Sequence, residues 1–273
     1  MSLEQIQDQL NCRIRQLSPF GLEIESPNKS TTVQTIPVEL LRPLLLIHRL
    51  ILLKGFCPID DQEQFSNLCR AWGQLLKWDF GTVFEVVERA EPKNYLFTRG
   101  SVPYHWDGAF AEQTPWLQFF QCREAVGQAV GGETIFCNTQ TLWETLAPET
   151  QELWSTIEIQ YTTNKVAHYG GRICARLVDR HPHTNETVLR FAEPPNAATV
   201  ALNTPELEVR GIPAQTAPEF LDHLVKLLYD TRFVYSHQWQ AGDFVIADNH
   251  VLLHGRNSYD EHEPRRLWRV HIL

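Results

Sequence analysis

The segment AGDFVIADNHVLLHGR, residues 241–256, contains two short apolar runs separated by polar residues. Gly242 and Asp243 are typical of a turn, and FVIA has the length and composition of a buried strand. Similar short segments recur from about residue 95 onward, namely NYLFTRG, WLQFFQC, GGETIFCN, TVLRF and RRLWRVHIL. Turn residues separate these segments. The pattern predicts a mainly β protein, a sandwich or barrel with flanking helices.

Helices are expected over residues 37–50, 60–76, 139–156 and 217–231, and LILLKGF from Leu50 is typical of a buried strand. Because these helices do not alternate with the strands, a doubly wound parallel sheet is not expected. Residues 1–36 alternate short apolar runs with turn residues, which predicts a strand-rich N-terminal extension. We expect the whole chain, residues 1–273, to form a single domain.

The composition excludes several classes of protein. The chain is 43% hydrophobic with eight Trp, enough for a large core, and its net charge of −9 with no Lys/Arg block disfavours nucleic-acid and membrane partners. Six Cys without a C-x-x-C pair indicate reduced thiols rather than disulfides or zinc. Arg42 and Arg49 interrupt the most apolar stretch, which begins at Leu40, so a membrane-spanning helix is not expected there. The first residues lack the apolar region of a signal peptide. A cytoplasmic protein is therefore expected, and a homo-oligomer is compatible with the sequence.

The segment VPYHWDGAF, residues 102–110, places His105 and Asp107 two residues apart. In a strand these side chains share a face, which is the arrangement of two ligands in the two-His, one-carboxylate site of a non-haem Fe(II) oxygenase. A strand-edge ion pair is the alternative interpretation. His254 is the preferred third ligand because of the arginines that follow it. His250 is the competitor and is expected to be a core or supporting histidine.

The last segment contributes cations. If RRLWRVHIL is a strand, Arg265, Leu267, Arg269 and His271 share one face. Inward arginines in a β core are costly unless they pair with anions, and a guanidinium can bind a carboxylate through two hydrogen bonds. The cosubstrate 2-oxoglutarate has two carboxylates, one that chelates iron and a distal one that needs a cation. Arg265 could supply the cation, and the Thr134 hydroxyl, after the two glycines of GGET, could share the contact.

These motifs, HWD, GGET, DN-x4-H and R-x3-R, resemble in order and spacing the TauD/TfdA family of Fe(II)/2-oxoglutarate dioxygenases, over roughly residues 37–273. The resemblance implies a double-stranded β-helix core, of the jelly-roll or cupin-like type, and a requirement for Fe(II), 2-oxoglutarate and O2. It implies His105, Asp107 and His254 as catalytic iron ligands, and Thr134 and Arg265 as 2-oxoglutarate anchors. Arg269 matches a position that often contacts an acidic substrate group. Ala247 departs from the family, which often has Trp there.

The segments PYHWDG, EPP at 193–195, and 237–256 are similar to dioxygenases of isocyanide natural-product pathways. This similarity implies a small-molecule substrate, an isonitrile carboxylic acid derived from tyrosine or tryptophan, and its oxidative decarboxylation to a vinyl isonitrile. Tyr104 and His168 are further candidates for substrate contact; His168 lies in HYGGR, either a lid or an ordinary glycine turn. His181 and His183 are expected in a solvated loop.

Two other functions are compatible with the sequence. One is a hydroxylase of the same family that acts on another small carboxylate or sulfonate. The other belongs to a different class, a non-catalytic β-sandwich binding protein with a degenerate site. The complete set of candidate ligands argues against the second function, and the mass of the product would separate the first from a decarboxylase.

Overall fold

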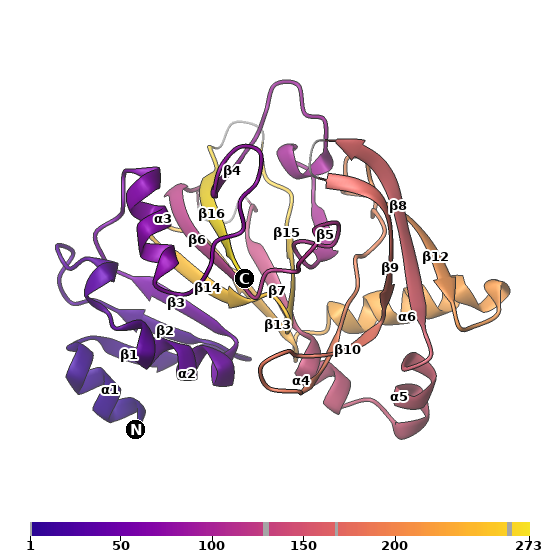
Figure 1. The fold of residues 1–273 in the computed structure, drawn as a ribbon, viewed down its shortest axis with the longest axis horizontal. Coiled ribbons are helices and arrows are strands. Elements are labelled where there is room, and N and C mark those ends of the chain that lie inside the picture. Colours follow the sequence, from indigo (N-terminus) through magenta and orange to yellow (C-terminus); the bar gives the residue numbers. More distant parts are fainter. Residues whose placement is uncertain (1, 128–130, 167–168, 261–263) are drawn as a thin grey trace.

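The computed structural model describes residues 2–127, 131–166, 169–260 and 264–273. Two sheets, which pack face to face, form the centre of the molecule (Figure 1). The larger sheet contains, in spatial order, β1 (Arg13–Gln16), β2 (Leu22–Glu25), β3 (Leu50–Lys54), β14 (Phe244–Asp248), β6 (Leu117–Glu124), β16 (Arg266–Ile272) and β4 (Val83–Val87). The smaller sheet contains β13 (Val234–His237), β7 (Thr134–Asn138), β15 (Leu252–Arg256) and β5 (Val102–His105). This arrangement is the jelly roll expected from the sequence.

Helices and two small sheets cover the outer faces. On the side of the larger sheet lie α1 (Leu3–Leu10), α2 (Val38–His48) and α3 (Gln62–Arg70) (Figure 1). On the other side lie α4 (Thr139–Glu144), α5 (Pro148–Trp154), α6 (Ala217–Leu228), a sheet of β12 (Glu206–Arg210), β8 (Glu158–Val166) and β9 (Tyr169–Arg176), and the pair β10 (Val178–Arg180) and β11 (Thr187–Leu189). Short 3-10 turns are η1 (Val33–Thr35), η2 (Tyr95–Phe97) and η3 (Ala214–Thr216).

Strand alternation decides which core each side chain joins. On β3, Ile51 and Leu53 pack outward against the helices, whereas Leu50 and Leu52 pack inward between the two sheets. The inner core takes apolar side chains from both sheets, including Phe120 of β6. Because neighbouring residues on a strand point to opposite faces, a ligand on an inner position shares this interior. The metal-binding candidates lie there.

Most of the helices agree with the sequence, and two features differ. The single helix expected over 139–156 is two helices, α4 and α5, since Pro148 begins α5 at a position where proline is favoured at a helix start. The N-terminal region contains β1 and β2 as expected, but also α1, which the strand-rich expectation missed. Ser2 and Gln5 form a capping box that begins this helix. In the part of the chain that the structure describes, no helix has the length and apolar character needed to cross a membrane.

Candidate active site

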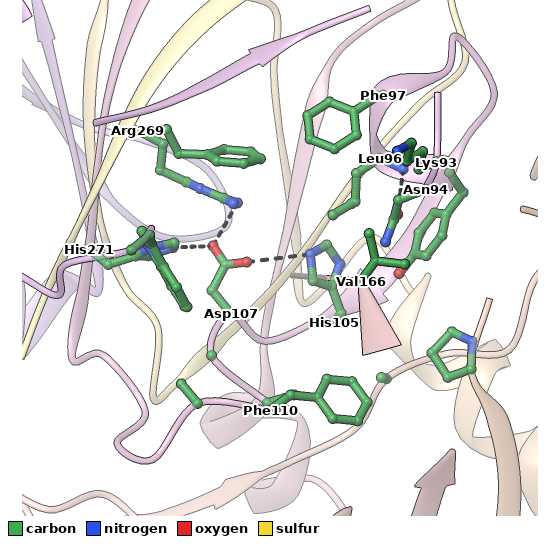
Figure 2. Close-up of a pocket in the computed structure, with 18 of the residues that line it drawn as sticks. Lys93, Asn94, Leu96, Phe97, His105, Asp107, Phe110, Val166, Arg269 and His271 are labelled. Carbon is green, nitrogen blue, oxygen red and sulfur yellow. Dashed lines mark hydrogen bonds and ion pairs between the residues drawn. The ribbon is translucent and has the colours of Figure 1, made fainter. Parts of the chain in front are cut away.

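Three side chains converge at one end of the space between the sheets. His105 ends β5, Asp107 follows it by two residues, and His254 lies on β15, which pairs with β5 so that His254 is directly opposite His105. One ligand atom from each residue lies within 4.8 Å of the others. Figure 2 shows His105 and Asp107 side by side at the wall of a cavity. The three residues therefore form one buried cluster that could hold a metal ion.

The carboxylate of Asp107 is held by donors on the side away from His105. Its Oδ2 accepts hydrogen bonds from Gln118 Nε2 at 2.6 Å and His271 Nε2 at 2.8 Å, and pairs with Arg269 Nη1 at 2.7 Å. Burial alone would raise the pKa of Asp107, but Arg269, His271 and His254 outweigh it and hold that pKa well below its usual range. The carboxylate is therefore an anion, ready to bind a cation.

The amide of Asn249 fixes the backbone of the same residue. Its Oδ1 accepts from the Asp107 N–H at 2.9 Å, and its Nδ2 donates to the Asp107 carbonyl at 3.1 Å. Gln118 also contacts Asn249 Oδ1 at 3.1 Å. A buried polar network with all its partners present is rigid. Asp107 is consequently fixed through both its backbone and its side chain.

The two histidines offer neutral ring nitrogens. His105 Nδ1 lies 2.9 Å from the Pro103 carbonyl, whereas its buried Nε2 has no hydrogen-bond partner among the residues that the structure describes. Burial lowers the pKa of both His105 and His254, so both rings are neutral at physiological pH. A neutral imidazole is the form that binds metals. The unpartnered Nε2 and the two-His, one-carboxylate donor set fit Fe(II).

A second group of polar side chains lies further into the sandwich. Arg265 donates from Nε to the Gly132 carbonyl at 2.9 Å and from Nη2 to Thr134 Oγ1 at 3.1 Å. Thr134 Oγ1 also accepts from Trp239 Nε1 at 2.8 Å, which leaves its hydroxyl hydrogen available to a further acceptor. Burial, together with nearby Arg256, lowers the pKa of Arg265 to about 9. A ligand carboxylate between Arg265 and Thr134 would relieve this destabilised charge.

Two cavities meet at the cluster. A narrow one of about 40 Å³ is lined by His105, His254, Thr134 and Arg265, and so joins the metal candidates to the anchor pair. The other, of about 540 Å³, is lined by His105, Asp107 and a set of aromatic side chains. The aromatic lining includes Trp78, Phe84, Phe97, Trp106, Phe110 and Tyr161. This geometry suits a small ligand anchored near Thr134 and an aromatic ligand beside the metal.

The sequence of the chain matches one protein family over almost its full length. The family model described as "Taurine catabolism dioxygenase TauD, TfdA family" matches residues 13–271. The chain belongs to the TauD/TfdA family. Members of this family are oxygenases that use Fe(II), 2-oxoglutarate and O2, and the donor sets described above fit the metal and the dicarboxylate.

Individual relatives have more specific names. The chain is 45% identical over 260 residues to 3-((Z)-2-isocyanoethenyl)-1H-indole synthase of Fischerella ambigua, covering 95% of each chain. It is 37% identical over 254 residues to tyrosine isonitrile desaturase of Pseudomonas aeruginosa, covering 93% of this chain and 87% of the relative. The chain is also similar in structure to PvcB of Pseudomonas aeruginosa, "an Fe, alpha-ketoglutarate dependent oxygenase from an isonitrile synthetic pathway". The two superpose with a TM-score of 0.80 at 34% identity, over 96% of this chain and 91% of PvcB.

The structure brings together most of the site residues that the sequence predicts. His105, Asp107 and His254 lie together in a cluster that could hold a metal ion, and Thr134 and Arg265 are hydrogen-bonded to each other. The expected close approach of the GGET turn is also present. A side chain on Gly131 would place Cβ 2.0 Å from the Ser258 carbonyl oxygen, at a φ of +90° that glycine favours.

Of the residues predicted to contact the substrate, one lines the larger cavity and another does not. Arg269 lines the larger cavity, but its charge already faces Asp107. Tyr104 does not line that cavity, because it points to the opposite face of β5 and packs against Tyr229 in the outer core. Tyr104 is therefore not in a position to contact a ligand in this cavity. His168 lies outside the described residues.

Sequence reasoning missed the supporting residues. Gln118 is one of two amides in the otherwise apolar run WLQFFQC, and a polar residue within such a run was the signal available. The expected solvated loop is wrong for His181, since its fully buried side chain bonds Asp248 at 3.1 Å. His250 is not in the metal cluster; its Nδ1 contacts Arg190, and burial followed by that cation lowers its pKa to about 2. The supporting role expected for His250 is compatible with this contact.

Proposed function

We propose that this protein converts an isonitrile carboxylic acid derived from tyrosine or tryptophan into the corresponding vinyl isonitrile, with Fe(II), 2-oxoglutarate and O2. One observation carries the proposal: the candidate metal cluster opens directly into a cavity of about 540 Å³ with an aromatic lining. The similarity to an isocyanoethenyl-indole synthase and to a tyrosine isonitrile desaturase supports the same substrate class. An aromatic ring on the substrate matches the lining of this cavity.

The proposed reaction removes CO2 and two hydrogens from the substrate. One hydrogen leaves the benzylic carbon, the carboxyl group leaves as CO2 with loss of its proton, and the alkene forms between the two carbons. One 2-oxoglutarate and one O2 accept the two hydrogens and yield succinate, a second CO2 and water. Bound Fe(II), with 2-oxoglutarate and O2, supplies the oxidant for the hydrogen removal.

The residues of the chain bind and orient the reactants. His105, Asp107 and His254 are the proposed metal ligands, and Arg265 with Thr134 is the proposed site for the distal carboxylate of 2-oxoglutarate. Holding the two ligands in neighbouring cavities replaces a random encounter by a fixed geometry.

The test is product mass spectrometry on purified protein with Fe(II), 2-oxoglutarate and O2. The isonitrile acids derived from tyrosine and from tryptophan are offered separately, and succinate is measured in parallel. Loss of CO2 and two hydrogens, matched by an equal amount of succinate, supports the proposal and identifies the side chain. Addition of one oxygen would instead identify a hydroxylase, and succinate without any change in either acid would refute the substrate class.

Variants of the proposed sites serve as controls in the same assay. Asp107→Ala should abolish turnover, because it removes the only carboxylate of the cluster in the described part of the chain. Arg265→Leu should raise the KM for 2-oxoglutarate by roughly 100-fold, since it removes a charge-assisted contact. Thr134→Val should have a smaller effect, about 10-fold, because a neutral hydrogen bond contributes less. An Arg265→Leu variant with an unchanged KM would exclude Arg265 as the anchor.

A further inference from the structure

The segment that ends in η2 brings one buried amide to the wall of the larger cavity. Asn94 is only 5% exposed and lines this cavity together with Leu96 and Phe97. Its Oδ1 accepts from the Leu96 N–H at 3.0 Å, which fixes the orientation of the amide. Figure 2 shows the nitrogen end of Asn94 turned into the cavity, on the side of His105. The hydrogen bond to Leu96 occupies Oδ1, so among the described residues Nδ2 is left to donate into the ligand space.

One arginine links this segment to β15. Arg256, two residues after the candidate ligand His254, donates to the carbonyls of Leu96, Thr98 and Gly100 at 3.2, 2.6 and 2.7 Å. These three carbonyls belong to the segment that contains η2 and precedes β5. Arg256 is itself buried. A single guanidinium therefore ties the cavity wall to the strand that carries His254.

We propose that the Asn94 side-chain amide holds the carboxylate of the aromatic acid substrate, and that Arg256 is a positioning residue that fixes this amide. The inference rests on the proposed function and adds the residue that recognises the acid group. An amide N–H can donate to a carboxylate but not to an indole N–H, which is itself a donor. The carboxylate is thus the strongest acceptor that the substrate can offer to Asn94.

The cations near the cavity are less suitable for this role. The guanidinium of Arg269 lies 2.7 Å from Asp107 and stacks over the Phe84 ring at 5.0 Å, so its charge is already compensated. Arg89 and Lys93 are exposed at the rim, where water and salt screen their charges. They can attract an anion to the cavity, but they lie outside its buried wall.

The chemistry also favours a neutral donor. The carboxylate has to leave as CO2, so its negative charge is lost during the reaction. A bidentate guanidinium would stabilise the bound anion more than the transition state and would slow its departure. One amide orients the group through a single hydrogen bond and stabilises its charge less. A neutral donor therefore positions the acid without opposing the decarboxylation.

The test uses the Fe(II)- and 2-oxoglutarate-loaded protein without oxygen. Isothermal titration measures the affinity for the tyrosine- and tryptophan-derived isonitrile acids and for their methyl esters. Asn94→Asp is the decisive variant, because it keeps the Oδ1 acceptor for Leu96 and replaces the donor by an anion of the same size. We expect it to weaken binding of the acid by roughly 30-fold or more and binding of the ester by less than about 3-fold.

Two further variants complete the design. Asn67→Asp makes the same exchange on an exposed position of α3 and should bind both ligands as the wild type does. Arg256→Lys keeps the charge but cannot reach three carbonyls at once, so it should lower the preference for acid over ester. A purely structural role of Arg256 would weaken both ligands equally and would overturn its part of the inference.

The outcomes separate this inference from the proposed function. If the wild type binds and converts the acid while Asn94→Asp retains the full preference for acid over ester, the assignment of Asn94 is overturned and the function stands. If the wild type binds neither ligand and converts neither acid, the proposed function itself fails. Loss of the acid preference in Asn94→Asp alone, with the control unchanged, supports the assignment.

Discussion

Replacing His271 by Phe tests how strongly the surroundings of Asp107 determine metal binding. The Asp107 Oδ2 has three donors, and His271 supplies one of them at 2.8 Å. Trp78 Nε1 donates to His271 Nδ1 at 3.2 Å, which makes Nδ1 the acceptor and leaves the ring hydrogen on Nε2, facing the carboxylate. The exchange to Phe keeps an aromatic ring and removes that donor. Trp78→Phe leaves the imidazole in place and removes the indole N–H that selects its tautomer.

The expected effect follows from the number of donors. A hydrogen bond to a charged acceptor contributes about 1.5–3 kcal/mol, and loss of a group that orients a metal ligand typically weakens metal binding about 10- to 100-fold. Because Gln118 and Arg269 remain on Oδ2, we expect His271→Phe to lie near the lower end, at roughly 10- to 30-fold. Trp78→Phe should weaken binding only a few-fold, roughly 2- to 5-fold, since the ring can still donate.

The assay is an anaerobic titration of the metal-free protein with Fe(II), repeated with Mn(II) to exclude oxidation. His223→Phe, an exposed exchange on α6, is the matched control and should bind the metal with wild-type affinity. A long-range 1H–15N spectrum reports the His271 tautomer independently of the metal. An unchanged metal affinity in His271→Phe, in a variant that unfolds at the wild-type temperature, would refute the view that this donor orients Asp107.

Three further predictions concern the glycine turn, a supporting histidine and the discarded substrate candidate. Gly131→Ala should lower the unfolding temperature and raise the KM for 2-oxoglutarate, because its Cβ would lie 2.0 Å from the Ser258 carbonyl oxygen; normal values of both would contradict the close approach. His250 has its pKa lowered from 6.5 to about 2 by burial and by Arg190, so the folded state binds fewer protons than the unfolded state below pH 6.5. Relative to His250→Gln, the wild type should lose up to about 1.4 kcal/mol of unfolding free energy for each pH unit below pH 6.5. Urea denaturation at several pH values measures this, and a difference between the two proteins that does not change with pH would contradict it. Tyr104→Phe should leave the substrate KM unchanged and stability equal or higher by up to about 1 kcal/mol, since the buried hydroxyl has no partner in the described structure; a raised KM would restore a substrate role.

The local pattern of the sequence was enough to predict the metal candidates. Strand alternation predicted that His105 and Asp107 share a face; the two side chains do meet, although Asp107 lies in the turn that follows β5. The same rule separated Arg265 and Arg269 from Arg266 on the last segment. The pairing of β15 with β5, which sets His254 opposite His105, follows no local rule. His254 was chosen as the third ligand from the order of the motifs along the chain, and the fold then places it opposite His105.

The supporting network was beyond sequence reasoning because its partners are far apart in the chain. Gln118 reaches His254 across 136 positions, and only the strand order β14–β6–β16 brings its amide to Asp107. The polar segment that contains His181 has the composition of an exposed turn. Most of the segment is exposed or half-buried, but His181 is buried, because Asp248, 67 positions away, compensates its ring. Composition describes a segment, whereas burial depends on what packs against it.

The register of β5 is the point on which the candidate site depends. Tyr104 and His105 are consecutive, so a slip of one residue would place the tyrosine at the metal and the histidine in the outer core. β5 is an edge strand of its sheet, so β15 pairs with only one side of its backbone. Glu193, in the EPP motif, supplies the missing partner: its N–H donates to the Tyr104 carbonyl at 2.8 Å, and its Oε2 accepts from the Tyr104 N–H at 3.0 Å. The motif therefore has a structural reason to accompany HWD, because it pairs with the strand that carries the proposed metal ligand His105.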